Sequence, residues 1–150
     1  LDAYLQALAR PSTALNPDLD ILLKEAASAG WKAGALSALG IDQAAALVAR
    51  LKLQDRVLVQ PSPKGPLGAP SPEGWLTVCK TMGLLPRCCV ALTVSAGGTL
   101  AALKAGLHCV AIPDNLAACQ DFGGADIVAD SFKDARLSAL KGLLHGCAFR

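Results

Sequence analysis

Neither a long apolar run nor a run of basic residues occurs in this sequence. A bilayer-spanning helix needs ~20 mostly apolar residues, and Pro, Lys or Asp interrupts every candidate stretch. The 14 Lys and Arg residues are scattered and the net charge is +2, so no positive stripe could follow a phosphate backbone. We therefore expect no transmembrane segment and no nucleic-acid binding. The opening LDAYLQALAR is not a signal peptide, and a start at Leu1 indicates a processed or incompletely represented N-terminus.

Metal-binding motifs are also lacking. The six cysteines form no C-x-x-C pair, and His108 and His145 are the two histidines, so no zinc site is expected. Cys88, Cys89 and Cys109 lie in apolar runs, where a free cysteine behaves as a small buried hydrophobe. We therefore predict free thiols rather than disulfides. Free thiols favour a reducing intracellular compartment, namely the chloroplast stroma, the mitochondrial matrix or the cytoplasm.

The sequence does contain the pattern of one packed α/β domain. Apolar residues make up 53% of the 150 residues, and apolar runs typical of buried parallel strands alternate with segments of helical periodicity. The predicted strands are 31–37, 56–60, 88–94, 107–113 and 126–130, and the predicted helices are 17–30, 41–53, 72–83, 95–106 and 131–144. Strands separated by helices predict a three-layer, Rossmann-like α/β fold with a parallel sheet and helices on both faces.

An ordered set of short motifs runs from Gly83 to Phe132. They are a Gly-hydrophobic-x-Pro turn, a strand followed by Ser, a glycine, a short helix closing in Ala-Gly, a strand ending in Pro, and an Ala-Asp pair. These positions hold Pro86, Ser95, Gly97, Ala105-Gly106, Pro113 and Ala125-Asp126. In this order and spacing, the sequence from Asn16 to about Leu144 resembles the second half of the haloacid dehalogenase (HAD)-like superfamily, particularly phosphatases and mutases similar to β-phosphoglucomutase. The resemblance implies a HAD-like core at 16–150, preceded by an N-terminal helical segment at 1–15 left from a cap or linker.

The resemblance also implies a site for phosphoryl groups. Family members transfer a phosphoryl group to an Asp nucleophile, with Mg²⁺ holding the phosphate and a lysine balancing its charge. Ser37 matches the family's phosphate-binding Ser or Thr, and with Ser95 and Gly97 it would form a vestigial phosphate pocket. For Ser37, a serine that merely satisfies a backbone turn is an equal alternative.

The charged groups of that chemistry are not matched. Ala69 stands at the lysine position, while Thr93 and Val94 stand where acids would hold Mg²⁺. Lys64, in the same loop as Ala69, is a weaker substitute for the lysine. Asp114 and Asp121 are remaining acids near that edge of the sheet, at positions where Asp commonly serves a turn. We therefore predict no catalytic residue and no metal ligand in the chain.

The Asp-x-Asp motif that carries the nucleophile is absent from the 150 residues. In the resembling family its strand lies between the strand that ends at Ser37 and the strand that ends near Ser95. Without it, two inner sheet edges would lack partners, and a buried unpaired backbone group costs about 1–3 kcal/mol. Upstream sequence, direct pairing of the two halves or a strand from a partner chain could each fill the gap.

Three functional hypotheses follow. The first is a catalytically inactive HAD-like domain that serves as a structural or interaction subunit among other protein subunits, with no cofactor. The second is a HAD-family phosphatase or phosphomutase whose nucleophile lies upstream of residue 1, which would use Mg²⁺. The third is a small-molecule binder that uses Ser37 and the turn at 95–98 as a neutral pocket.

Overall fold

The computed structural model describes residues 14–63 and 69–147. Its α-helices are α2 (Pro17–Ser28), α3 (Ile41–Arg50), α4 (Pro72–Met82), α5 (Ala96–Lys104) and α6 (Leu137–Leu143), with a 3₁₀ turn η1 at Pro86–Cys88. Its strands are β1 (Ala33–Ser37), β2 (Val57–Pro61), β3 (Val90–Thr93), β4 (His108–Ala111) and β5 (Ile127–Val128). The predicted helical segment at 1–15 lies, apart from its last two residues, outside the described residues.

Local sequence explains where the main helices begin and end. The Asn16 side chain accepts hydrogen bonds from the amides of Asp18 and Leu19 at 2.9 and 3.3 Å, and Pro17 opens the first turn of α2. Ser71 caps α4 in the same way, by accepting from the Gly74 amide. Helix α4 ends at Gly83, whose φ of +71° is a left-handed conformation that glycine adopts at little cost.

The strands form two parallel sheets, one of β1 and β2 and one in the order β3-β4-β5. Ala33 pairs with Val57 in the first sheet, and Val90 pairs with His108 in the second. The predicted parallel α/β fold is thereby confirmed. The sheet is divided, however: β1, which ends at Ser37, belongs to one part, and β3, which ends two residues before Ser95, belongs to the other.

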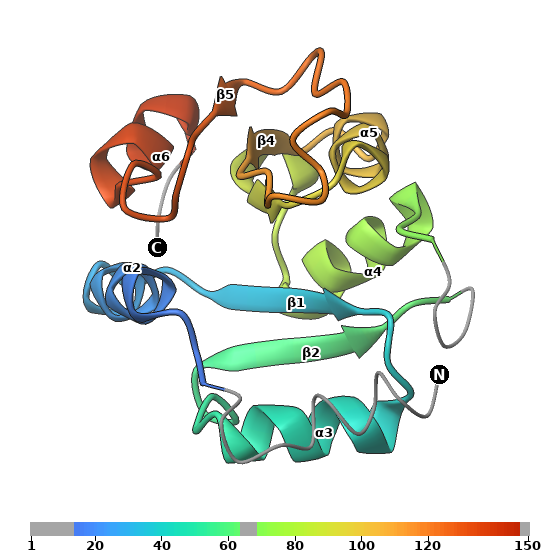
Figure 1. The fold of residues 1–150 in the computed structure, drawn as a ribbon. Coiled ribbons are helices and arrows are strands. Elements are labelled where there is room, and N and C mark those ends of the chain that lie inside the picture. Colours follow the sequence, from blue (N-terminus) through green and yellow to red (C-terminus); the bar gives the residue numbers. More distant parts are fainter. Residues whose placement is uncertain (1–13, 64–68, 148–150) are drawn as a thin grey trace.

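Helices cover these strands on two sides (Figure 1). Helix α4 packs on β1 and β2, α5 packs on β3 and β4, and the two helices contact each other. Helices α2 and α6 contact each other on the other side of the strands. Strand β4 is the most deeply buried, with Cys109, Val110 and Ala111 all at 0% exposure.

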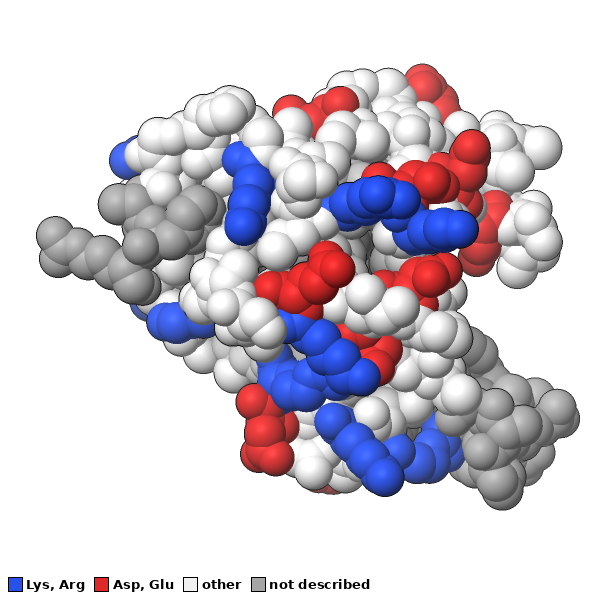
Figure 2. Space-filling model, turned by 90° about the vertical axis from the view of Figure 1, so that its left-hand side faces the viewer, with Lys and Arg blue, Asp and Glu red and all other residues white. Residues whose placement is uncertain are grey.

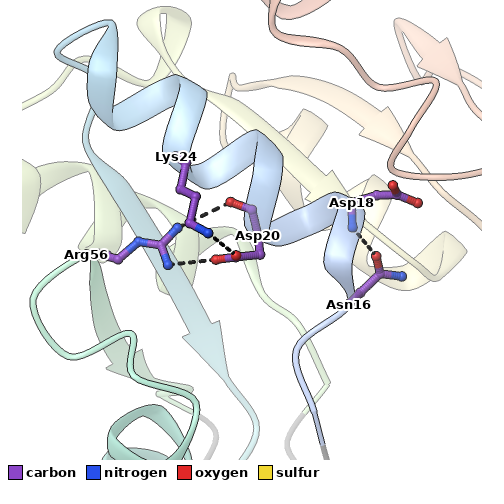
Figure 3. A network of polar contacts seen from close by, with 5 residues as sticks. All are labelled: Asn16, Asp18, Asp20, Lys24 and Arg56. Atoms are coloured by element: carbon purple, nitrogen blue, oxygen red, sulfur yellow. Dashed lines mark hydrogen bonds and ion pairs between the residues drawn. The ribbon is translucent and has the colours of Figure 1, made fainter.

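An ion-pair network fastens α2 to the residue before β2 (Figure 3). The Asp20 carboxylate lies 2.7 Å from both Lys24 Nζ and Arg56 Nη1, and Arg56 Nη2 also donates to the Asp20 carbonyl at 3.3 Å. The hydrogen bonds from Lys24 and Arg56 lower the pKa of Asp20. The network therefore holds α2 over the first sheet at every pH above the lowered pKa of Asp20, where its carboxylate is ionised.

The surface carries charges of both signs. On the face shown in Figure 2, Lys and Arg side chains alternate with Asp and Glu, and no band of one sign crosses it. Across the described part of the chain, no helix is both long enough and apolar enough to cross a bilayer. The latter observation agrees with the expectation of no transmembrane segment.

Two predictions about local structure were wrong. The structure joins Cys88 to Cys147 in a disulfide with a Cα–Cα distance of 5.7 Å, so Cys88 is not a free buried thiol. Cys88 instead ends η1, and β3 begins only at Val90. The predicted helix at 131–144 starts at Leu137, because the Ser131 hydroxyl donates to Asp134 at 2.7 Å and holds the preceding residues in turns.

Cys89 and Cys109 are buried free thiols, as predicted. Cys79, also buried, lies beside Cys89, and its hydrogen bond together with burial raises the pKa of the Cys89 thiol. A raised pKa keeps that sulfur in its unreactive protonated form. The reducing compartment remains a prediction, and the Cys88–Cys147 bond counts against it because disulfides persist mainly in oxidising surroundings.

Candidate functional site

Ser37 lies at the carboxyl end of β1, as the sequence predicts. Its Oγ accepts a hydrogen bond from the Leu39 amide at 3.1 Å, and its carbonyl accepts from the Ser62 amide at 2.7 Å. Ser37 therefore does serve a backbone turn. The turn uses only an acceptor position of the hydroxyl, so the hydroxyl proton can still be donated to a ligand oxygen.

Ser95 and Gly97 lie at the start of α5, two and four residues after the end of β3. Ser95 caps the helix, with its Oγ accepting from the Gly98 amide at 3.2 Å. The Ala96 amide donates to the side chain of Gln120 at 2.8 Å. Gln120 was not among the predicted site residues, and because it is 24 residues away no local pattern could have identified it.

Thr93 and Val94 occupy very different environments. Thr93 is 5% exposed, and its Oγ1 lies 2.7 Å from Thr99 Oγ1 and 3.5 Å from Cys109 Sγ. Val94 is 48% exposed and apolar. A Mg²⁺ ion requires accessible oxygen ligands, preferably carboxylates, so these two positions do not fit the ion that the family implies. Within residues 14–63 and 69–147 no three His, Cys, Asp or Glu side chains group as a metal site would require.

The remaining acids and the lysine position give no substitute for those groups. Asp114 Oδ1 accepts from the amides of Leu116 and Ala117 at 2.9 and 2.8 Å, and Asp121 accepts from Gly123 at 2.8 Å. Both acids serve turns, as predicted. Ala69 is exposed, and Lys64 lies outside the described residues.

A cavity of about 660 Å³ lies between the two sheets. Its lining includes residues 33–36 of β1, residues 90–92 of β3 and side chains from α2, α4 and α6. Ser37 directly follows the lining residues of β1, and Thr93 directly follows those of β3. Of the candidate phosphate-binding residues, Ser37 thus stands at the end of one strand that borders this cavity, and Ser95 and Gly97 follow the end of the other by two and four residues.

His108 and Asp126 form a pair beside the second sheet. Asp126 Oδ2 accepts from the buried Cys109 amide at 2.7 Å, and Oδ1 lies 3.3 Å from His108 Nδ1. Burial disfavours the charged carboxylate, but these two hydrogen bonds outweigh burial and lower the pKa of Asp126. The pair thus anchors the loop before β5 to β4.

We expect Asp126→Ala to lower the free energy of unfolding by about 1 kcal/mol at pH 7, because it leaves the Cys109 amide without its acceptor. Since the folded pKa lies below the unfolded value of ~3.9, the ionised carboxylate stabilises the fold above that pH, and the contribution disappears as pH falls through the folded pKa. Urea titrations from pH 7 to pH 2 should show the two proteins converging in acid. Asp130→Ala, at an exposed position, is the control and should change neither the free energy of unfolding at pH 7 nor its dependence on pH. If the stabilities of wild type and Asp126→Ala still differ at pH 2 as they do at pH 7, the assignment is contradicted.

Comparison with known proteins places the fold. No family model matches the chain. The chain is 26% identical over 140 residues to "Putative phosphatase YhcW" of Bacillus subtilis, covering 93% of this chain and 56% of that protein. It is 30% identical over 146 residues to protein CbbY of Cereibacter sphaeroides, covering 95% of this chain and 63% of CbbY.

Solved structures agree with these relatives. The crystal structure of CbbY from Rhodobacter sphaeroides in complex with phosphate matches this chain with a TM-score of 0.81 at 25% identity. The match covers 93% of this chain and 64% of that chain. A HAD hydrolase from Entamoeba histolytica shares the fold, with a TM-score of 0.80 at 14% identity over 95% of this chain and 66% of that chain. The chain thus spans less than two thirds of the length of the curated relatives it matches. The motif order, the parallel α/β architecture and these relatives together support the resemblance of this chain to the HAD-like superfamily.

Proposed function

We propose that this chain forms the serine-bearing part of a phosphoryl-group site in a HAD-like phosphatase or phosphomutase, and that the acidic groups of that site come from outside residues 1–150. The observation that carries the proposal is that Ser37 ends β1 and that Ser95 begins α5 two residues after β3, while both strands line one cavity. In open α/β sheets, ligands bind at the carboxyl ends of strands, where the strand order reverses.

The chemistry at these strand ends suits a phosphate ester. The Ser37 hydroxyl can donate a proton to a phosphate oxygen while its own oxygen holds the turn. At the start of α5 the Ala96 and Gly98 amides already donate to Gln120 and Ser95, but the partial positive charge of a helix N-terminus still favours an anion. Support also comes from the relatives, one of which is named a phosphatase and one of which binds phosphate in its crystal structure.

The test is phosphate binding by the longest natural polypeptide that contains this chain. We expect Ser37→Ala to weaken the affinity for inorganic phosphate about 10-fold to 100-fold by calorimetry, because a hydrogen bond to a charged group contributes ~1.5–3 kcal/mol. Ser28→Ala is the control, because the Ser28 hydroxyl donates to the Lys24 carbonyl on α2. Equal affinities for wild type and Ser37→Ala would refute the assignment.

A non-catalytic domain is the second candidate, and a specific observation favours it. Ala69 and Val94 carry no charge, and the Thr93 hydroxyl is buried against Thr99. Electrostatic stabilisation provides most of the catalysis in phosphoryl transfer, so these residues alone would support little turnover. A domain that serves only a structural role or binds other protein subunits would tolerate these three residues at the positions of the charged groups.

Hydrolysis of p-nitrophenyl phosphate with Mg²⁺ separates the two candidates. For residues 1–150 alone, we expect no turnover above background, because the chain lacks the acids of the site. Turnover by the longest natural polypeptide would favour the phosphatase, and its absence there would favour the non-catalytic domain. Metal-dependent turnover by residues 1–150 that survives Ser37→Ala but is lost in Asp114→Ala would contradict both, because it would reveal a metal site at Asp114.

A further inference from the structure

One disulfide ties the C-terminal end of the described chain to the start of the second sheet. Cys147 follows α6 by four residues, and Cys88 ends η1, two residues before β3 begins. The two cysteines are 59 positions apart in the sequence, and their Cα atoms lie 5.7 Å apart. The bond therefore holds residues 137–147 against the turn that leads into β3.

Residues 137–147 form a weak element of the fold. Helix α6 is seven residues long, and its N-cap, Arg136, makes no side-chain hydrogen bond. The helix lies beside α2 (Figure 1) and is docked through Leu140 and Leu144, which are 5% and 4% exposed. An isolated helix shorter than ~12–15 residues is marginal in water. Without the disulfide, we therefore expect this segment to detach more readily than the strands unfold.

Solvent can reach the disulfide, whereas the thiols of two neighbouring cysteines are inaccessible. Cys88 and Cys147 are half-buried, but Cys79 and Cys89 are 1% and 8% exposed. Thiol–disulfide exchange requires a thiolate to reach one sulfur of the bond, and exposed disulfides are the labile or regulatory ones. Cys89 does not compete as an internal thiolate, because its hydrogen bond with Cys79 and burial raise the pKa of the Cys89 thiol. External reductants and oxidants therefore act on Cys88 and Cys147.

We propose that the Cys88–Cys147 bond is a reversible redox clasp, which a dithiol reductant opens to release residues 137–147 while the sheets stay folded. One thiolate of the reductant attacks a sulfur of the bond and forms a mixed disulfide, and the other cysteine leaves as a thiolate that takes up a proton. The second thiol of the reductant then loses its proton and displaces the remaining cysteine. The protein thus gains two thiols, and the reductant leaves as a disulfide.

The clasp lies at the opposite end of β3 from the candidate phosphate site. Cys88 precedes the strand, whereas Ser95 follows it by two residues. Opening the clasp is therefore not expected to displace Ser95. The inference goes beyond the proposed function and would stand if no phosphate bound, so its tests measure thiol reactivity and local unfolding.

Alkylation with iodoacetamide tests whether the bond is reversible. The longest natural polypeptide is alkylated without denaturant in excess dithiothreitol and again after removal of the reductant in air, and peptide mass spectrometry identifies the alkylated cysteines. We expect Cys88 and Cys147 to react only in dithiothreitol. Cys119, an exposed free thiol, is the control and should react in both states. A bond that resists dithiothreitol until the protein is denatured, or alkylation of Cys88 and Cys147 in both states, would overturn the proposal.

Hydrogen exchange tests whether reduction releases the segment. In wild type, reduction should speed the exchange of amides in residues 137–147 by about 10-fold or more, because loss of the cross-link lowers the free energy of local opening. Amides of residues 108–111, in β4, are the internal control and should not change. Cys147→Ser should exchange rapidly in both redox states, whereas Cys119→Ser should behave as wild type.

Three outcomes of the exchange experiment would contradict the clasp. The first is unchanged exchange of residues 137–147 in reduced wild type, which would show that the segment does not depend on the bond. The second is an equal acceleration in residues 108–111, because the bond would then support the whole fold. The third is a Cys147→Ser protein that fails to fold, because the reduced form must stay folded.

Discussion

Replacing Thr93 with aspartate is expected to lower the free energy of unfolding by ~3–5 kcal/mol, the cost typical of an uncompensated buried charge. Thr93 is 5% exposed, and its hydroxyl is engaged by Thr99 on the following helix. The buried Cys109 of β4 lies on its other side. A carboxylate there would lose its hydration and gain at most one hydroxyl donor.

Val94→Asp is the matched control for that substitution. Val94 is the next residue and is 48% exposed, so its carboxylate would remain hydrated, and a surface substitution of this kind typically changes stability by less than ~0.5 kcal/mol. Urea denaturation of the two variants measures the difference. Equal destabilisation would show that Thr93 is not held in the buried position described. An acid at either Thr93 or Val94 could then be accessible to a metal ion.

Gly34→Val is expected to lower the free energy of unfolding by about 1–3 kcal/mol or more, because it overpacks the contact between β1 and α4. A Cβ atom at Gly34 would lie 2.7 Å from Val78 Cγ1 and 3.0 Å from Met82 Sδ. Both neighbours belong to α4, which also packs on β2. The helix must shift to accept any side chain at this position, and the branched valine requires the larger shift.

Gly97→Ala provides the comparison for Gly34→Val. A Cβ at Gly97 would meet nothing within 4 Å, and alanine in place of glycine inside a helix typically stabilises it by ~0.5–1 kcal/mol. Thermal unfolding should therefore show opposite signs for the two variants. A Gly34→Val protein as stable as Gly97→Ala would mean that β1 does not lie against α4.

The strands were predictable because their sequences are apolar and bounded by turns. The apolar runs 31–37 and 88–94 predicted both strands and their order, and the helix starts were predictable from Asn16-Pro17 and Pro72, where a proline opens the first turn. The division into two sheets did not follow from the sequence, because the missing motif left direct pairing of the two halves open as an alternative. The strands and the helix starts depend on residues close together in the sequence, so they were predictable from the sequence.

Contacts between distant residues could not be predicted in this way. Cys88 and Cys147 are 59 residues apart, and cysteine spacing does not determine pairing. Gln120 reaches the start of α5 from the loop that follows β4. The burial of the Trp75 indole nitrogen without a hydrogen-bond partner among the described residues also depends on how the elements pack. Each of these depends on tertiary packing, which the order of residues leaves open.

The central claim is that Ser37 at the end of β1 contributes to a phosphoryl-group site, and the affinity of the longest natural polypeptide for inorganic phosphate tests it most directly. Titration calorimetry should give an affinity about 10-fold to 100-fold weaker for Ser37→Ala than for the wild type, because a hydrogen bond to a charged group contributes ~1.5–3 kcal/mol. Equal affinities for the two proteins would contradict the claim.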